Sequence, residues 1–195
     1  MADVKISALT AAGSALSTDE VPVNQGGTTK KVTLAQVSAA IGSLGAGKVV
    51  QEVYFETGAY AAGSTIIPLD DTIPQNTEGD QYMTVSITPT SATNRLKIDV
   101  VFNSMGTAAA ILTLCVFQDA IANAIATTFT YNSDATVGQQ IVLTKRMLAG
   151  TTSAITFKVR AGYHVGGTVY FNGQAAARKY GGTLVSCISV QEIIP

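Results

Sequence analysis

Residues that could carry out chemistry are few and scattered in this sequence. His164 is the only histidine, and it lies in the glycine-flanked stretch 161–167, which is typical of a loop. The only cysteines, Cys115 and Cys187, lie in two separate apolar stretches. One histidine and two distant cysteines cannot form a tetrahedral zinc site, and the Gly-x-Ser-x-Gly motif of serine hydrolases is absent. We therefore expect no catalytic residue, no metal, no cofactor and no enzymatic activity.

Acidic pairs and thiols have simpler structural explanations. Asp70 and Asp71 are adjacent, and Glu78 and Asp80 flank a glycine. Neither pair has the alternating spacing of a calcium-binding loop, so we interpret both pairs as turn formers. The two cysteines are interpreted as buried small side chains without a disulfide bond.

Aromatic and amide side chains near predicted turns offer a different chemistry, which is surface recognition. Aromatic rings provide contact area at a low cost in side-chain entropy, and they also stack on sugar faces. Alternatively, the tyrosines cap the core and place only their hydroxyl groups in water. The candidates for a receptor-contacting surface are Tyr131, Asn132, Tyr163, His164, Tyr170, Asn172 and Tyr180.

Composition excludes several functional classes. Charged residues make up 13% of the chain and the formal net charge is −1, so the sequence has no basic stripe that could neutralise phosphates. We therefore expect no nucleic-acid partner. No apolar run approaches the roughly 18 residues that span a bilayer, and the first residues lack a secretion signal. We expect no membrane insertion and synthesis in a cytoplasm.

The hydrophobic pattern from residue 48 onward alternates with a period of two, which predicts half-buried strands. No long helical pattern separates these strands, so an all-β fold of two packed antiparallel sheets is expected, in a jelly-roll arrangement of about nine or ten strands. The predicted strands are 49–55, 65–68, 82–88, 95–102, 110–118, 126–131, 139–148, 155–160, 168–171 and 183–192.

One of these strands, 110–118, is apolar on both faces, which requires cover on both sides. Its second face carries Ile111, Thr113, Cys115 and Phe117. Two explanations remain open at this stage. A subunit interface could cover this face, or a loop of the same domain could do so.

A short helix is predicted before the β domain. Thr33 and Gln36 fit a capping box that starts the helix, and Gly45 and Gly47 end it. The apolar stripe consists of Leu34, Val37, Ile41 and Leu44. An isolated helix below about 12–15 residues is marginal in water, so this stripe must pack either against copies of itself in a parallel bundle or against its own domain.

Residues 1–32 are predicted to form an extended arm, because Pro22 and Gly26-Gly27 prevent a long helix. The helix and a glycine hinge then occupy residues 33–47, and the β domain occupies residues 48–195. Such an arm has too little apolar content to fold alone and should dock onto a partner. Its candidate docking side chains are Ile6, Leu9, Leu16, Val21 and Val23.

The segments 5–9, 19–23 and 25–36, the last with the sequence Gln-Gly-Gly-Thr-Thr-Lys-Lys-Val-Thr-Leu-Ala-Gln, resemble the N-terminal region of bacteriophage virion proteins. Tail fibres, short spikes and head fibres carry versions of this region. The resemblance implies a homotrimer located in the virion, joined to other virion proteins by its N-terminal arm, with an outward β-sandwich knob that adheres to polysaccharide or protein on the host surface. One alternative is a head-fibre or decoration protein on the major capsid protein. Another is a polysaccharide-degrading tip enzyme.

Overall fold

The computed structural model describes residue 16 and residues 18–44, 46–134 and 137–195. The chain divides into two compact units, Met1–Ala46 and Gly47–Pro195, and each is described separately. We call them the N-terminal unit and the knob. No helix in the described ranges is long and apolar enough to cross a lipid bilayer.

The described part of the N-terminal unit contains a β-hairpin that the sequence analysis missed. Strands β1 (Glu20–Gln25) and β2 (Thr28–Thr33) pair antiparallel where an arm without strands was expected. Gly26 and Gly27 have φ values of 62° and 79°, which a two-residue type I′ turn requires. Gly26 and Gly27 therefore form the turn of a hairpin, whereas the sequence analysis interpreted them only as residues that prevent a long helix. The predicted docking residues Ile6 and Leu9 lie outside the described residues.

Helix α1 (Leu34–Leu44) follows β2 directly, and the predicted capping box is present. The backbone N–H of Gln36 donates to Thr33 Oγ1 at 3.2 Å, and the N–H of Thr33 donates to Gln36 Oε1 at 2.9 Å. These two bonds satisfy donors that the first turn of a helix leaves without partners. The predicted start of the helix is confirmed.

The described part of the N-terminal unit has no buried core. None of the side chains described in residues 16–39 is buried. Leu16 and Val21 are 61% and 42% exposed, whereas Val23, Leu34 and Val37 are half-buried. An 11-residue helix and a two-stranded hairpin are each marginal without a packed apolar face. The apolar side chains described in this unit are therefore exposed or only half-buried within the chain.

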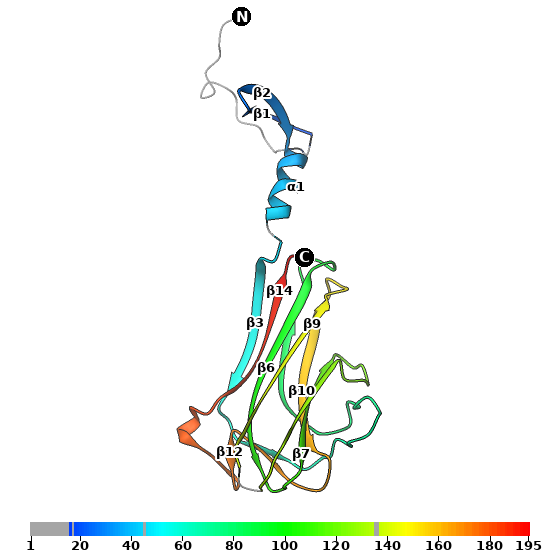
Figure 1. Cartoon of the computed structure of the whole chain (residues 1–195), viewed down its shortest axis with the longest axis vertical. Coiled ribbons are helices and arrows are strands. Elements are labelled where there is room, and N and C mark those ends of the chain that lie inside the picture. Colours follow the sequence, from blue (N-terminus) through cyan, green and yellow to red (C-terminus); the bar gives the residue numbers. More distant parts are fainter. Residues whose placement is uncertain (1–15, 17, 45, 135–136) are drawn as a thin grey trace, which may run out of the picture. The chain divides into compact units, whose positions relative to one another are not determined.

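The knob is an all-β sandwich of two antiparallel sheets (Figure 1). One sheet has the order β5 (Asp80–Ile87), β10 (Ile155–Tyr163), β7 (Ile111–Gln118) and β8 (Ala126–Tyr131). The other contains β3 (Val49–Thr57), β14 (Ser186–Ile193), β6 (Arg95–Gly106) and β9 (Gln139–Leu148), with β11 (Val169–Phe171) and β4 (Ala61–Gly63) extending the end of β6. Taken in chain order, the eight long strands alternate between the sheets, except that the neighbours β7 and β8 lie in the same sheet, as in a jelly roll.

The core lies between the inner faces of the two sheets. Leu96, Ile98, Val100 and Phe102 of β6 alternate with outward residues and are fully buried. Burial of one such side chain stabilises the fold by about 1.5–3 kcal/mol. The period-two pattern in the sequence thus located the core correctly, and β8 and β9 have the predicted bounds. The predicted strand at 65–68 is wrong, because this segment leaves the sheet.

Residues 64–79 instead cross the outer face of the sheet that contains β7. Ile67 is 1% exposed and forms a small cluster with Cys115, Phe117 and Ala124. The N–H of Ile67 donates to the carbonyl of Tyr163 at 3.0 Å, which fixes this segment on β10. Cys115 and Phe117 are fully buried within one chain, so the predicted subunit interface is wrong for these two residues, and Thr113 is 6% exposed. A loop of the same domain covers this face.

Buried Glu192 organises one end of the sandwich. It accepts hydrogen bonds from the N–H and Oγ1 of Thr90, both at 2.8 Å, from Asn94 Nδ2 at 2.7 Å, and from Gln51 Nε2. Burial alone raises the pKa of Glu192, but the bonds from Gln51, Thr90 and Asn94 outweigh it and lower the pKa to about 2. The ionised carboxylate therefore holds the β5–β6 turn against β14.

We expect Glu192 to make the stability of the knob depend on pH at acidic values. Its pKa falls from an ordinary 4.5 to about 2 on folding, so its contribution is complete above pH 4.5 and is lost as the pH falls towards 2. The shift corresponds to about 3 kcal/mol. Denaturant unfolding of Glu192→Gln should show a loss of this size near neutral pH that shrinks below pH 4.5. The control Glu52→Gln, at an exposed position of β3, should change little. An equal loss at all pH values would contradict the assignment.

Candidate functional site

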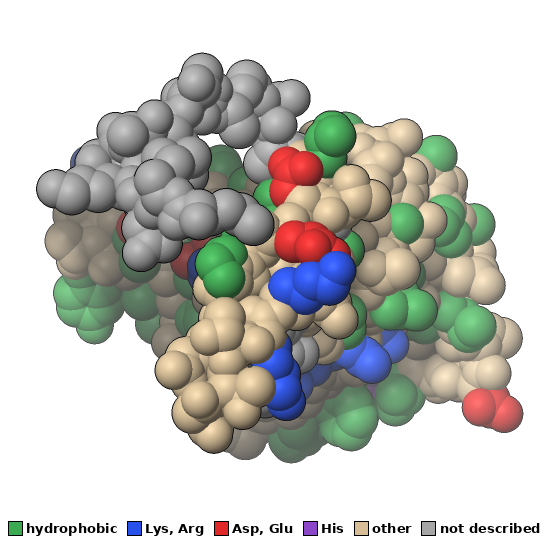
Figure 2. Space-filling model, turned by 90° about the horizontal axis from the view of Figure 1, so that it is seen from above, with side chains coloured by type: hydrophobic (Ala, Val, Ile, Leu, Met, Phe, Trp, Pro, Cys, Tyr) green, Lys and Arg blue, Asp and Glu red, His purple; other side chains and the backbone are tan. Residues whose placement is uncertain are grey.

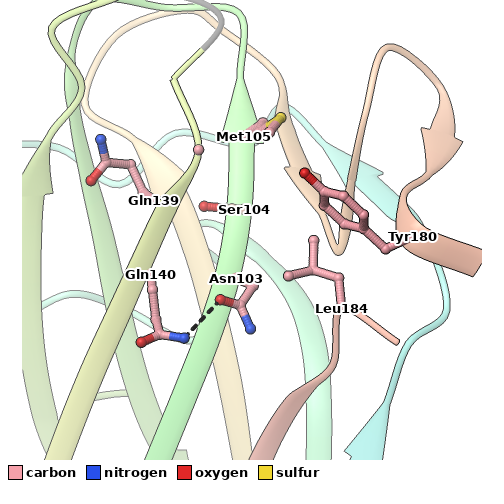
Figure 3. Close-up of a pocket in the computed structure, with 8 residues that line it drawn as sticks. Asn103, Ser104, Met105, Gln139, Gln140, Tyr180 and Leu184 are labelled. Carbon is pink, nitrogen blue, oxygen red and sulfur yellow. Dashed lines mark hydrogen bonds between the residues drawn. The ribbon is translucent and has the colours of Figure 1, made fainter. Parts of the chain in front are cut away.

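A pocket of about 220 Å³ lies where three distant parts of the knob meet (Figure 3). The end of β6 contributes Asn103, Ser104 and Met105, and the start of β9 contributes Gly138, Gln139 and Gln140. Tyr180, in the short 3-10 helix η2 (Tyr180–Gly182), and Leu184 complete the lining. None of these eight residues is charged. The pocket therefore combines neutral amides and the Tyr180 hydroxyl with a surface that is mainly apolar.

The amide of Asn103 is held in place by its neighbours. Its Nδ2 donates to the carbonyl of Val185, and its Oδ1 accepts from Gln140 Nε2 at 3.1 Å (Figure 3). The backbone N–H of Asn103 donates to Ser186 Oγ at 2.9 Å, and Ser186 Oγ donates to Asn172 Oδ1 at 2.7 Å. Connected polar networks of this kind rigidify the groups that they contain. The pocket therefore has a preorganised polar wall.

Ser104 adds a polar group without a partner. Its side chain is 4% exposed, and its hydroxyl forms no hydrogen bond within the described part of the chain. Most buried polar atoms in proteins are hydrogen-bonded, so this hydroxyl is an exception. It lies on the inward face of β6 with almost no accessible surface, so a ligand in the pocket does not reach it.

The segment that carries Tyr180 has a strained backbone. Four of the five non-glycine residues with positive φ in the described ranges lie here: Asn172, Ala175, Ala176 and Tyr180. Tyr180 has a φ of 51°, and its side chain is 75% exposed. A left-handed conformation costs an ordinary residue about 1–2 kcal/mol. Such strain concentrates at functional sites, and here it presents an aromatic ring to solvent beside the pocket.

Some of the predicted receptor residues are exposed or half-buried in the structure, and others are buried. Tyr131 is 61% exposed, and Tyr170 and His164 are half-buried. Asn132, Tyr163 and Asn172 are buried, so the prediction that they contact a receptor is wrong. Asn132 Nδ2 donates to Tyr163 Oη, and Asn172 Nδ2 donates to the carbonyl of Thr57 at 2.7 Å. These amides close the ends of the sandwich because they satisfy groups that would otherwise be buried without partners.

The other residues whose side chains could take part in catalysis or metal binding also have structural roles. His164 Nδ1 accepts from the backbone N–H of Ile111 at 3.2 Å. Asp70 Oδ1 accepts from the N–H and the hydroxyl of Thr72, which lowers the pKa of Asp70 and forms a turn. Among the described residues, no group of three or more His, Cys, Asp or Glu could hold a metal ion.

Both cysteines are free. Cys115 is buried as expected, and burial raises the pKa of its thiol to about 11, which keeps it protonated. Cys187 is only half-buried, because it faces outward from β14, so the prediction of burial is wrong for this residue.

The sequence analysis identified Tyr180 but missed Asn103, Gln139 and Gln140. These three residues lie in β6 and β9, where the alternating sequence pattern predicts only whether a side chain points outward or inward. Asn103 and Gln140 are paired across β6 and β9, and Leu184 lies far away in the sequence. No local signal could have brought these residues together.

No protein-family model and no curated protein match this chain. Among solved structures, the chain is similar to the CBM36-1 domain of a multidomain xylanase from the hindgut metagenome of Trinervitermes trinervoides, with 8% identity, a TM-score of 0.38 and coverage of 72% of this chain and 96% of that chain. It is also similar to the Eiger TNF of S. frugiperda, with 8% identity, a TM-score of 0.40 and coverage of 73% and 92%.

A third similar structure is the enzymatically active domain of tailspike protein 4 from bacteriophage CBA120, with 12% identity and a TM-score of 0.28. The match covers 76% of this chain and 21% of that chain. At such low identities and TM-scores, these likenesses support no inference about function.

We expect Ala176→Gly to stabilise the knob. Ala175 and Ala176 form the two-residue turn between β12 (Gly173–Gln174) and β13 (Ala177–Arg178), with φ values of 49° and 64°. Glycine adopts this conformation without the steric cost of a Cβ, so the free energy of unfolding should rise by about 0.5–1 kcal/mol. Thermal unfolding would measure this change. The matched control Ala62→Gly, at an exposed position of β4, should lower stability, and a loss in both variants would contradict the interpretation.

Proposed function

We propose that this protein is a structural subunit of a bacteriophage virion, a homotrimeric short fibre or spike. Its N-terminal unit attaches it to other virion proteins, and its knob adheres to the host surface. The observation that carries the proposal is the contrast between the two units. The knob has a continuous buried core, whereas residues 16–39 contain no buried side chain in the part that the structure describes.

The N-terminal unit supports attachment and self-association. Leu16 and Val21 expose apolar side chains that a partner protein can cover. Leu34 and Val37 lie three positions apart on α1 and are only half-buried. A parallel bundle of three copies would bury this stripe and so stabilise a helix that is marginal by itself. The resemblance of segments 5–9, 19–23 and 25–36 to the N-terminal region of phage virion proteins agrees with this arrangement.

The knob supports self-association through a different surface from the one first predicted. Strand β8 is an edge strand, and its outward side chains Phe129 and Tyr131 are 63% and 61% exposed. Natural edge strands are usually protected by charges, proline or a covering loop, whereas β8 reads Ala-Thr-Thr-Phe-Thr-Tyr. Ile111, on the neighbouring strand, is half-buried. We propose that a second copy of the chain covers this edge.

The low charge of the surface is compatible with contacts between identical subunits. Neutral polar groups and hydrophobic side chains cover far more of the face in Figure 2 than charged side chains do. Identical chains with a net charge of −1 repel one another only weakly.

The second candidate function is a capsid decoration protein or head fibre with the same two units. A density map of the intact particle, traced from the first residues, separates the two candidates. Contacts of residues 16–44 with tail or baseplate proteins support the fibre. Contacts with the major capsid protein support decoration.

The helix stripe predicts the oligomeric state. The full chain should have three times its monomer mass in light scattering, and Leu34→Ser with Val37→Ser should shift the trimer towards monomer, because two apolar contacts per helix are lost. The control pair Ala35→Ser with Ala39→Ser, at exposed positions of the same helix, should leave the mass unchanged. A monomeric parent chain would refute the homotrimer.

The β8 edge predicts a second effect. Phe129→Ser with Tyr131→Ser should weaken the trimer about tenfold or more, since interface aromatics commonly contribute over 1 kcal/mol each. Concentration-dependent sedimentation would measure this change. The control Tyr54→Ser removes an equally exposed ring from the outward face of β3 and should have no effect. Equal behaviour of the two variants would show that β8 is not an interface.

A further inference from the structure

The pocket beside Tyr180 has the properties of a carbohydrate site. A sugar ring has an apolar face made of C–H groups and an edge of hydroxyl groups, each of which both donates and accepts hydrogen bonds. The pocket offers the exposed aromatic ring of Tyr180, the exposed amide of Gln140 and the amide of Asn103. We propose that it binds one neutral sugar unit of a surface glycan, an inference that rests on the adhesive role proposed above for the knob.

Tyr180 is the stacking surface. Its ring is 75% exposed, although its backbone is strained at a φ of 51° and the following Gly181 and Gly182 are also left-handed, at 64° and 96°. The N–H and Oγ1 of Thr183 both donate to the carbonyl of Tyr180, at 3.1 and 2.8 Å, which fixes this conformation. The backbone that carries the ring is thus ordered before a ligand binds, which limits the entropy lost on binding.

The polar wall selects hydroxyl groups. Asn103 is fixed by Val185 and Gln140, so its amide cannot turn away from a ligand. Gln140 is exposed and uses one amide hydrogen on Asn103, which leaves its Oε1 and its second N–H for the ligand. Such a wall gives orientation and specificity to a ligand whose apolar face already packs on Tyr180.

Size and charge restrict the ligand further. The volume of about 220 Å³ is below the roughly 300–1,000 Å³ of pockets for drug-sized ligands, so the pocket accommodates one ring and not a chain of rings. None of the lining residues is charged, so nothing in the wall would compensate a carboxylate or sulfate group. A neutral terminal sugar fits both limits. A single weak site per chain would bind a glycan-coated surface firmly through three copies in the trimer.

The test uses the full chain and defined probes. Saturation-transfer difference NMR would be recorded with the methyl glycosides of glucose, galactose, mannose and N-acetylglucosamine, and with a sialic acid glycoside as the anionic probe. We expect transfer to the ring protons of at least one neutral glycoside. Tyr180→Ala should weaken that binding about tenfold or more, and Tyr180→Phe should retain it because stacking needs only the ring.

Controls separate the pocket from the rest of the surface. Tyr54→Ala removes a ring that is 74% exposed on β3 and should leave binding unchanged. Gln140→Leu should weaken binding without changing the thermal midpoint by more than a few degrees, since the backbone pairing of β6 and β9 remains. Absence of binding to every neutral glycoside, binding that survives Tyr180→Ala, or binding of the anionic probe alone would each overturn the proposal.

Measuring the oligomeric state of the same samples distinguishes failure of the sugar-site proposal from failure of the trimer proposal. A trimer that binds no neutral glycoside overturns only the sugar site. A monomer that binds a neutral glycoside through Tyr180 overturns the trimer and keeps the sugar site.

Discussion

The last strand of the chain, β14, is the element on which the rest of the knob depends. It lies between β3 and β6, so it joins the first long strand of the knob to the longest one (Figure 1). Its inward side chains change from polar to apolar and back to polar: Ser186, Ile188, Val190 and Glu192 are all buried. The two apolar residues fill the core, while each polar residue organises one end of the sandwich. Ser186 holds the wall of the pocket through Asn103 and Asn172, and Glu192 holds the β5–β6 turn.

This arrangement explains how the knob can tolerate a strained site. Buried polar groups are costly unless their hydrogen bonds are satisfied, and Asn172 uses its side-chain amide to satisfy Thr57 and Ser186 while its own backbone is left-handed. The segment that follows can therefore hold Tyr180 in an unfavourable conformation, because its start is fixed to two strands. The stability of the core and the geometry of the pocket share the same few contacts.

The N-terminal unit, in contrast to the knob, has no buried side chain among those described in residues 16–39. Its local structure is well specified, with a two-glycine turn and a complete capping box, but local bonds contribute only about 0.5–2 kcal/mol each and cannot replace a core. The proposed trimer and the proposed attachment would both cover apolar side chains that are exposed or half-buried within one chain. The same physical reason underlies the proposed contact at the β8 edge.

The sequence by itself determined the features that depend on neighbours along the chain. Alternation with a period of two located β6, β8 and β9 and the inward residues of β6, and the Thr33–Gln36 spacing located the start of α1, because these patterns reflect local geometry. Only the tertiary structure decided which side chains are free. Asn132, Tyr163 and Asn172 look like surface recognition residues in sequence, yet contacts with residues distant in the sequence bury them. The covering of β7 by Ile67 likewise depends on a segment outside the strands. The pocket is the clearest case, because residues 103–105 and 138–140 become neighbours through the pairing of β6 with β9, and residues 180–184 join them just before β14.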